Sequence, residues 1–271
     1  MYLDIVAENW DVLVLDDYKA VMPIPWKKKY AIKYVTQPLW LLELGVFSLE
    51  VKVDTQPFFK SLFNKFRFVE SRLNTDTIFD TTSVFLLSKE MQVLSLDEEY
   101  DTVFKNYRKD RRKDLAKADK LDLTEKWKDS SEKLIELFKN NVGKRTPNIL
   151  EPDYVILKNL IDTCVEKRVG EILSIYENND HLVASGFFLK HKKTATILVS
   201  STDFKNRKNG ANTFLIDRAI FKYEKNFDVL NFGGSSMPTI AKYFLSFGGF
   251  TLKYQEIKLN KLPFLLKLFK K

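Results

Sequence analysis

The turn that follows the apolar segment 194–201 carries residue types that bind anionic groups. It contains Lys205, Arg207 and Lys208, and a helical pattern begins after Gly210. The first backbone N–H groups of a helix have no partner inside the helix and favour negative charge, and Gly210 would let a phosphate approach the backbone closely. The turn therefore predicts an anion site, although a plain loop with solvated lysines would have the same sequence.

A second candidate lies at residues 231–236, where an apolar strand ends in Gly233, Gly234, Ser235 and Ser236. Paired glycines leave a bare backbone beside which a ligand could lie in an opened sheet. The same residues suit a tight turn in which Ser235 or Ser236 caps the next helix, and both interpretations can hold together.

Acid–base chemistry has three candidate side chains. Glu171, at the start of one predicted strand, and Asp203, at the end of another, are candidate general bases, and Tyr243 on a predicted helix is a candidate general acid. Two surface carboxylates and a core tyrosine would give the same pattern. His181 and His191 fall in predicted turns, and we expect neither to meet a carboxylate.

A mixed α/β fold must position these residues. From residue 121 onward, hydrophobic periodicity predicts strands at 121–127, 171–177, 182–190, 194–201, 229–232 and 250–259, and helices at 130–141, 152–168, 208–225 and 238–247. The first hundred residues predict mainly strands, with one helix at 58–66. Pro23 and Pro25 predict that 20–25 is an edge strand or a loop. The sheets should therefore be mixed and largely antiparallel, with flanking helices.

Residues 98–120 predict a strongly helical, charged segment, with a basic helix at 105–120. Positions 105–120 hold eight Lys or Arg and three Asp. The outer face of this helix could bind a polyanion, or it could be a solvated surface with Asp–Lys pairs. Arg111 falls on an otherwise apolar stripe, so we expect it to be paired with a carboxylate or with carbonyl groups at a junction between two halves of the chain.

Composition limits the remaining possibilities. The 271 residues are 45% hydrophobic and 30% charged, with a net charge of +8, which indicates one or two folded domains and favours anionic partners. With only Cys164 and two histidines, we predict no disulfide and no metal site. No apolar stretch is long enough to cross a membrane, so we expect a cytoplasmic protein. The basic, apolar tail 258–271 should dock on the N-terminal half; contact with an anionic membrane surface is the alternative.

The order of these elements resembles the GNAT acyltransferase fold, and more narrowly its FemAB-like branch, which pairs two GNAT-like domains. The resemblance rests on the turn 207–211, on residues 232–235 and on residues 246–249. The basic helix with Arg108, Arg111 and Arg112 is similar to a helix of that branch, as are Gln37-Pro38-Leu39 and the following Leu44-Gly45. The resemblance implies an α/β (α+β) fold with a reduced N-terminal domain, 1–104, and a complete C-terminal domain, 105–271.

This resemblance implies transfer of an acyl or aminoacyl group to an amine. An acyl-CoA donor would lie along 194–201, and a backbone N–H near Val199 would polarise its carbonyl. Glu171 or Asp203 would be the base and Tyr243 the acid. The donor's diphosphate would meet Arg207, Lys208, Asn209, Gly210, Ala211 and Asn212.

Two positions depart from the family patterns. Asn212 stands where GNAT proteins have a small residue, and Phe244 stands where the FemAB-like branch has a lysine. The leading expectation is therefore acyl-CoA-dependent N-acyltransfer to a small amine or amino sugar. One alternative is aminoacyl-tRNA-dependent transfer to a cell-wall precursor. The other is a GNAT-fold module that binds a ligand without catalysing a reaction.

Overall fold

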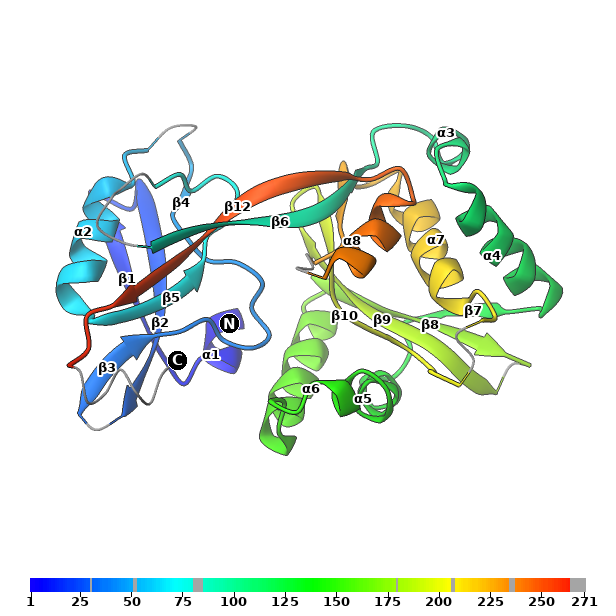
Figure 1. The fold of residues 1–271 in the computed structure, drawn as a ribbon, viewed down its shortest axis with the longest axis horizontal. Helices are drawn as coiled ribbons and strands as arrows, with labels where there is room; N and C mark the ends of the chain where they lie inside the picture. Colours follow the sequence, from blue (N-terminus) through cyan, green and yellow to red (C-terminus); the bar gives the residue numbers. More distant parts are fainter. Residues whose placement is uncertain are drawn as a thin grey trace. The chain divides into compact units, whose positions relative to one another are not determined.

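The computed structural model describes residues 1–29, 31–50, 53–79, 85–178, 180–205, 208–233 and 237–263. These residues form helices that flank a mixed sheet (Figure 1). The chain divides into two compact units. Unit 1 comprises Met1–Glu90 and the segment that starts at Lys253, and unit 2 comprises Met91–Leu252. The units therefore do not follow a division after residue 104, because 91–104 belong to unit 2 and the last strand belongs mainly to unit 1.

Unit 1 is built from strands with one covering helix. Its strand order is β1-β2-β3-β5-β12, with β4 paired to β2. Its core joins α2 side chains Phe58, Phe59 and Leu62 to strand side chains that include Val69 and Leu259. Leu259 confirms that the start of the basic tail docks on the N-terminal half; residues 264–271 lie outside the described part. The elements that begin in this unit are α1 (Tyr2–Val6), β1 (Asn9–Leu15), β2 (Ala20–Lys29), β3 (Ile32–Val35), β4 (Phe47–Ser48), α2 (Gln56–Lys65), β5 (Phe68–Arg72) and β6 (Phe85–Ser95).

The predicted edge position of the proline-containing strand is wrong, because β2 has β1 on one side and both β3 and β4 on the other. Pro23 and Pro25 pair with β1. On the opposite side, the described pairing covers Ala20–Val21 with β4 and Trp26–Lys29 with β3. On that side the prolines therefore fall between two paired segments, a position that suits residues without an N–H to donate.

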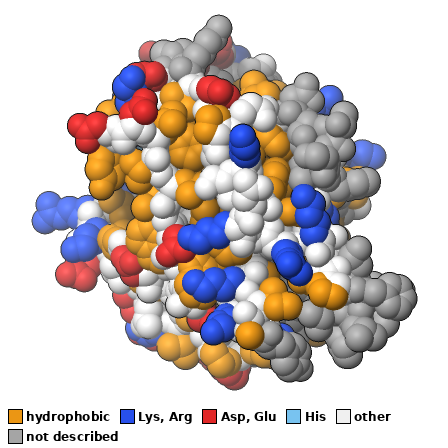
Figure 2. Space-filling model, turned by 90° about the vertical axis from the view of Figure 1, so that its left-hand side faces the viewer, with side chains coloured by type: hydrophobic (Ala, Val, Ile, Leu, Met, Phe, Trp, Pro, Cys, Tyr) orange, Lys and Arg blue, Asp and Glu red, His pale blue; other side chains and the backbone are white. Residues whose placement is uncertain are grey.

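Apolar side chains are also exposed on unit 1. On β1, Trp10, Val12 and Val14 alternate with less exposed residues, and Phe47 of β4 is exposed as well. Figure 2 faces the side of unit 1 and shows hydrophobic side chains interspersed with Lys and Arg and with Asp and Glu side chains. This surface is therefore both apolar and charged.

Unit 2 places helices on both faces of its strands. The strand order is β6-β11-β10-β9-β8-β7. Figure 1 shows α5 and α6 on one face of these strands and α4 and α7 on the other. The remaining elements are α3 (Tyr100–Lys105), α4 (Lys109–Lys120), β7 (Thr124–Trp127), α5 (Ser131–Asn140), a short 3₁₀ helix (Gly143–Arg145), α6 (Glu151–Glu166), β8 (Gly170–Glu177), β9 (His181–His191), β10 (Thr194–Thr202), α7 (Ala211–Tyr223), β11 (Val229–Asn231), α8 (Pro238–Leu245) and β12 (Phe250–Asn260).

Coverage on both faces explains the sequence of the central strands. Seven successive residues of β8 are buried, because a strand covered on both faces buries every side chain. The helices that cover it carry apolar faces at helical spacing, such as Leu157, Leu160, Ile161 and Cys164 of α6. The antiparallel order β8-β9-β10 is the predicted meander.

The segment 98–120 is helical, as predicted, but it is divided into α3 and α4, so the helix expected over 105–120 begins only at Lys109. The chain turns at Tyr107 and Arg108, and Arg108 has an extended backbone. Tyr107 is buried, and its hydroxyl donates a hydrogen bond to Asp217 of α7 at 3.2 Å. The backbone N–H of Arg108 donates to the carbonyl oxygen of Ser246 at 2.9 Å. The break between α3 and α4 thus places the Tyr107 side chain in the core. A continuous helix would direct this side chain elsewhere.

Candidate functional site

The first feature of the site is a β-bulge in β10. In the pairing with β9, Ile197 faces Phe188 and Val199 faces Phe187, so Leu198 is an extra residue. The parallel pairing with β11 covers Thr194–Thr196 in the described part of the chain. The bulge therefore lies just beyond the end of that pairing, where it changes the direction in which the backbone N–H and C=O groups of β10 point.

The glycine at the end of β11 has a packing role. Gly233 has a φ of +81°, and a Cβ there would lie 2.5 Å from the carbonyl oxygen of Ile197. Only glycine allows the chain after β11 to approach β10 this closely. Gly234, Ser235 and Ser236, the rest of the predicted ligand-facing turn, lie outside the described residues.

The predicted anion corner at the start of α7 is covered by α4. Gly210 has a φ of +85°, and a Cβ there would lie 2.2 Å from the backbone carbonyl oxygen of Asp114. The side of Gly210 on which a Cβ would lie therefore faces α4. The carbonyl oxygen of Asp114 also places negative partial charge beside the N-terminus of α7, where a phosphate was expected.

The other residues of this corner are differently placed. Lys208 is exposed, and Arg207 lies outside the described residues. Asn209 is buried; its Oδ1 accepts from the N–H of Ala211 at 2.9 Å, and its Nδ2 has no partner among the described residues. Asn212 accepts a hydrogen bond from Thr202 at 3.2 Å. The N–H of Ala211 and the side chain of Asn212, which were both expected to meet a diphosphate, therefore already have partners within the protein.

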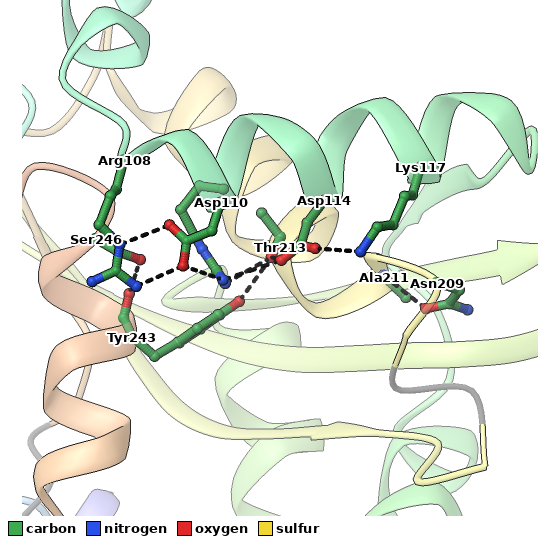
Figure 3. A network of polar contacts seen from close by, with 10 residues as sticks. Arg108, Asp110, Asp114, Lys117, Asn209, Ala211, Thr213, Tyr243 and Ser246 are labelled. Carbon is green, nitrogen blue, oxygen red and sulfur yellow. Dashed lines mark hydrogen bonds and ion pairs between the residues drawn. The ribbon is translucent and has the colours of Figure 1, made fainter.

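Tyr243 belongs to a polar network that joins α4, α7 and α8 (Figure 3). Its hydroxyl lies 3.4 Å from Thr213 Oγ1, and the Arg111 guanidinium carbon lies 4.6 Å from the centre of its ring. Burial raises the pKa of Tyr243 to about 12, although Thr213 and the charge of Arg111 lower it. The phenol therefore stays protonated throughout the neutral range and can only donate a proton there.

Arg111 is paired, as its place on an apolar stripe predicts. Its guanidinium lies 3.1 Å from both Asp110 and Asp114 and donates to Thr213 at 3.1 Å. These partners belong to α4 and α7, so the expected junction between two halves of the chain is a junction between helices of unit 2. Arg111 therefore connects the covered start of α7 to Tyr243.

Phe244 occupies the position at which the FemAB-like pattern has a lysine. Its ring stacks on Phe232 with a centroid separation of 4.6 Å and an interplanar angle of 11°. The two rings pack against the core of unit 2. Residue 244 thus has a packing role.

Glu171 is held in an ion pair on β8. Its carboxylate accepts from Lys222 at 2.7 Å and from the Tyr223 hydroxyl at 3.0 Å, and Lys190 lies 3.5 Å away. Burial raises the pKa of Glu171, but Lys222 and Lys190 outweigh burial and hold this pKa below its ordinary value. The structure does not bring Glu171 together with Tyr243.

Asp203 lies just past the end of β10, beside His181. The His181 Nε2 is 3.7 Å from the Asp203 carboxylate, and its Nδ1 is 3.6 Å from that of Glu177. The expectation that His181 meets no carboxylate is therefore wrong. Asp203 follows Val199 by four residues, which is roughly 13 Å along a strand, so it does not reach a group bound at the bulge.

Asp203 and His181 line a pocket of about 910 Å³, which we call the α5–β10 pocket. Its walls come from α5, the 3₁₀ helix, the start of β9 and the residues after β10. The sequence analysis missed Lys144 and Arg145 in this wall. Four Lys or Arg and three Asp or Glu are among its described lining residues. Pockets of this size hold small molecules.

The described part of the chain contains neither a cluster of metal ligands nor a helix that could span a membrane. No group of three or more His, Cys, Asp or Glu residues in the described ranges could hold a metal ion. Among the helices that the structure describes, none has the length and apolar character needed to span a bilayer.

Comparisons with known proteins identify the fold. No family model matches the chain, and no curated protein matches its sequence. The crystal structure of FemX matches with a TM-score of 0.70 at 11% identity, over 100% of this chain and 92% of that chain. The C-terminal domain of a putative lysylphosphatidylglycerol synthetase from Agrobacterium fabrum matches with a TM-score of 0.59 at 12% identity, over 93% of this chain and 84% of that one.

A tandem GNAT protein from the clavulanic acid biosynthesis pathway matches with a TM-score of 0.51 at 9% identity, over 94% of this chain and 84% of that one. Similarity at such low identity shows the fold and not the activity. The protein therefore has a GNAT-like fold of the FemAB-like type, in which helices flank a mixed sheet.

Proposed function

We propose that this protein transfers an acyl group from an activated donor to the amine of a small acceptor, with acyl-CoA as the leading donor and an amine or amino sugar as acceptor. The observation that carries the proposal is the bulge at Leu198, which lies where the described pairing of β10 with β11 ends. Backbone groups at such an edge can bind an extended, amide-containing donor as an added strand would.

The chemistry needs few side chains. The amine nitrogen attacks the donor carbonyl carbon, the bond from that carbon to the donor's sulfur or oxygen breaks, and in net a proton passes from the amine to the leaving group. A backbone N–H near Val199 would stabilise the negative charge on the carbonyl oxygen. Tyr243, which its high pKa keeps protonated, would donate its own proton to the leaving group and take up the proton that the amine loses.

The structural neighbours support a transferase of this class. One is by name a putative lysylphosphatidylglycerol synthetase, and the structure of the tandem GNAT protein is described as lacking AcCoA. Aminoacyl-tRNA as donor, with a cell-wall precursor as acceptor, is the alternative within the class. The contact of Gly210 with the Asp114 carbonyl argues against a diphosphate at the start of α7. No step of the reaction is assigned to residues 208–212.

A second candidate is a module that binds a ligand without transferring a group. The packing of Phe244 on Phe232 favours it, because a core phenylalanine replaces a polar residue of the FemAB-like pattern. The contacts of Tyr243 with Thr213 and Arg111 would then be structural.

A transfer assay separates these functions. Acetyl-CoA and longer acyl-CoA donors are incubated with amines and amino sugars, aminoacyl-tRNA is tested in parallel, and N-acyl products are detected by mass spectrometry. We expect a product with acyl-CoA. Tyr243→Phe should lower kcat by about 10- to 100-fold and leave KM nearly unchanged. Tyr254→Phe is the matched control, since Tyr254 is also buried but lies on β12 in unit 1.

Each result has a clear meaning. Product from aminoacyl-tRNA alone would replace acyl-CoA as the donor. Donor binding with no product from any donor would overturn the transferase proposal and leave the binding module.

A further inference from the structure

The start of α7 is a poor place for a phosphate in this protein. A phosphate there would need to contact N–H groups beside Gly210, but the carbonyl oxygen of Asp114 faces that position. The N–H of Ala211 already donates to Asn209. The carbonyl oxygen of Asp114 would repel an anion bound there, and the anion would have to break the hydrogen bond from Ala211 to Asn209. Both effects oppose anion binding at the start of α7.

Cations that have no carboxylate partner among the described residues gather instead in the α5–β10 pocket. Lys144, Arg145 and Lys205 line the pocket and are exposed. No ion pair joins any of the three to a carboxylate that the structure describes. Lys133, a fourth cation of the wall, donates to the Tyr176 hydroxyl at 3.0 Å. The carboxylates of Glu136, Asp180 and Asp203 line the same pocket, so four cations face three carboxylates there. The three cations that have no carboxylate partner in the described part of the chain remain available to an anionic ligand.

The C-terminus of α5 does not account for these cations. Cations often follow the end of a helix because they interact with its last carbonyl groups. Here the Leu137 carbonyl accepts hydrogen bonds from the side chains of Asn141, at 2.9 Å, and Ser201, at 3.2 Å. The Leu137 carbonyl therefore does not need Lys144 or Arg145 as a partner.

Contacts between the end of α5 and the segment after β10 hold the wall of the pocket in place. Asn141 is buried and accepts from the backbone N–H of Phe204 at 2.7 Å, which ties the end of α5 to the segment after β10. The Arg145 guanidinium carbon lies 4.1 Å from the centre of the Phe204 ring. This contact orients the planar guanidinium, whose paired N–H groups suit two oxygens of a phosphate.

The pocket also lies at a suitable distance from the bulge. Asp203 and Lys205 follow Val199 along the chain, so the pocket is roughly 13 Å beyond the bulge in the direction of β10. A donor with its carbonyl at the bulge and its arm along β10 would extend toward the pocket. The volume, about 910 Å³, is that of a small-molecule site.

We propose that the phosphate groups of a nucleotide-type acyl donor bind in the α5–β10 pocket, at Lys144, Arg145 and Lys205, and not at the start of α7. This inference rests on the proposed acyl transfer for the identity of the donor. The phosphate site itself can be tested without any transfer reaction.

Calorimetric titration of the whole chain with coenzyme A and with inorganic pyrophosphate tests the inference. Arg145→Glu and Lys205→Glu should each weaken both ligands by about tenfold or more, because each removes a charge-assisted contact and adds a repulsion. Lys208→Glu reports on the start of α7 and should change binding less than about threefold. Lys113→Glu, at an exposed residue of α4, controls for net charge. Circular dichroism confirms that each variant is folded.

Three outcomes would overturn the inference. One is loss of binding in Lys208→Glu but not in Arg145→Glu, which would place the phosphates at α7. The second is no binding of either ligand by the wild-type chain. The third is binding of tRNA, but not of coenzyme A, that depends on Arg145 and Lys205, because the pocket would then recognise RNA.

The inference and the proposed function fail separately. A chain that binds pyrophosphate through Arg145 and Lys205 but forms no N-acyl product keeps the phosphate site and loses the transferase. A chain that forms product from acyl-CoA with an unchanged KM in Arg145→Glu and Lys205→Glu keeps the transferase and loses this phosphate site.

Discussion

The contact between Gly210 and α4 can be tested by adding one methyl group. In Gly210→Ala, the new Cβ would lie 2.2 Å from the Asp114 carbonyl oxygen and 3.0 Å from its carbon. Both atoms belong to the backbone, so α4 must move by about 1 Å to restore ordinary contact. The residue must also keep a φ of +85°, which alanine disfavours.

The size of the effect follows from these two terms. A left-handed backbone costs alanine about 1 kcal/mol relative to glycine, and overpacking of a well-packed contact costs about 1–3 kcal/mol. We therefore expect Gly210→Ala to lower the free energy of unfolding of unit 2 by about 2–4 kcal/mol. For a unit of this size, that corresponds to a fall in Tm of roughly 5–15 °C.

Gly248→Ala is the matched control. Gly248 has a nearly equal φ of +87°, but a Cβ there would meet the Asn106 Cβ at 2.9 Å and no backbone atom nearer than 3.7 Å. It should cost about 1–2 kcal/mol, mainly for the left-handed backbone. The assay is urea unfolding followed by circular dichroism, with peptide-resolved hydrogen exchange to follow α4. Equal losses in the two variants, with unchanged exchange in α4, would refute the packing of α4 on Gly210.

Three further predictions concern single side chains. Tyr243→Phe should leave the ultraviolet titration of the protein unchanged through pH 10, where ordinary tyrosines ionise, because the pKa of Tyr243 is about 12; a lost step near pH 10 would contradict its burial. Glu171→Gln should be about 1–3 kcal/mol less stable than wild type at neutral pH. Because the pKa of Glu171 in the folded chain lies below its ordinary 4.5, this difference should shrink as pH falls below 4.5, and a pH-independent difference in denaturant unfolding would contradict the ion pair with Lys222. Asn141→Ala should weaken pyrophosphate binding several-fold and cost about 1–3 kcal/mol of stability, since it leaves the N–H of Phe204 without its acceptor; calorimetry and denaturant unfolding measure both, and unchanged binding would show that this clamp does not shape the pocket.

Local sequence predicted the elements of unit 2 well because their patterns are strong. The segments 171–201 combine apolar runs with short turns, and the structure has β8, β9 and β10 there. The break between α3 and α4 was missed because nothing local shows that Tyr107 reaches Asp217, more than one hundred positions away. A charged helical pattern records propensity, and this long-range contact overrides it.

The site shows a similar limit. A glycine pattern indicates that something approaches the backbone but not what it is, and at Gly210 a helix takes the place expected for a phosphate. The meeting of His181 and Asp203 could have been predicted from the meander, because the start of one antiparallel strand lies opposite the end of the next. The cations at 144 and 145 carried no motif, and only the fold brings them to the end of β10.

Unit 1 is formed by two segments that are separated in the sequence by all of unit 2, and this order affects how the protein folds during synthesis. Its core includes Ile257 and Leu259 of β12, whereas unit 2 is one uninterrupted stretch, Met91–Leu252. A ribosome therefore completes the second unit before it has made the strand that the first unit needs, and domains generally fold as units during synthesis. The strands of unit 1 that precede unit 2 in the chain should therefore reach their native packing only after unit 2 has folded, and until then β5 presents an unsatisfied edge for chaperones to recognise.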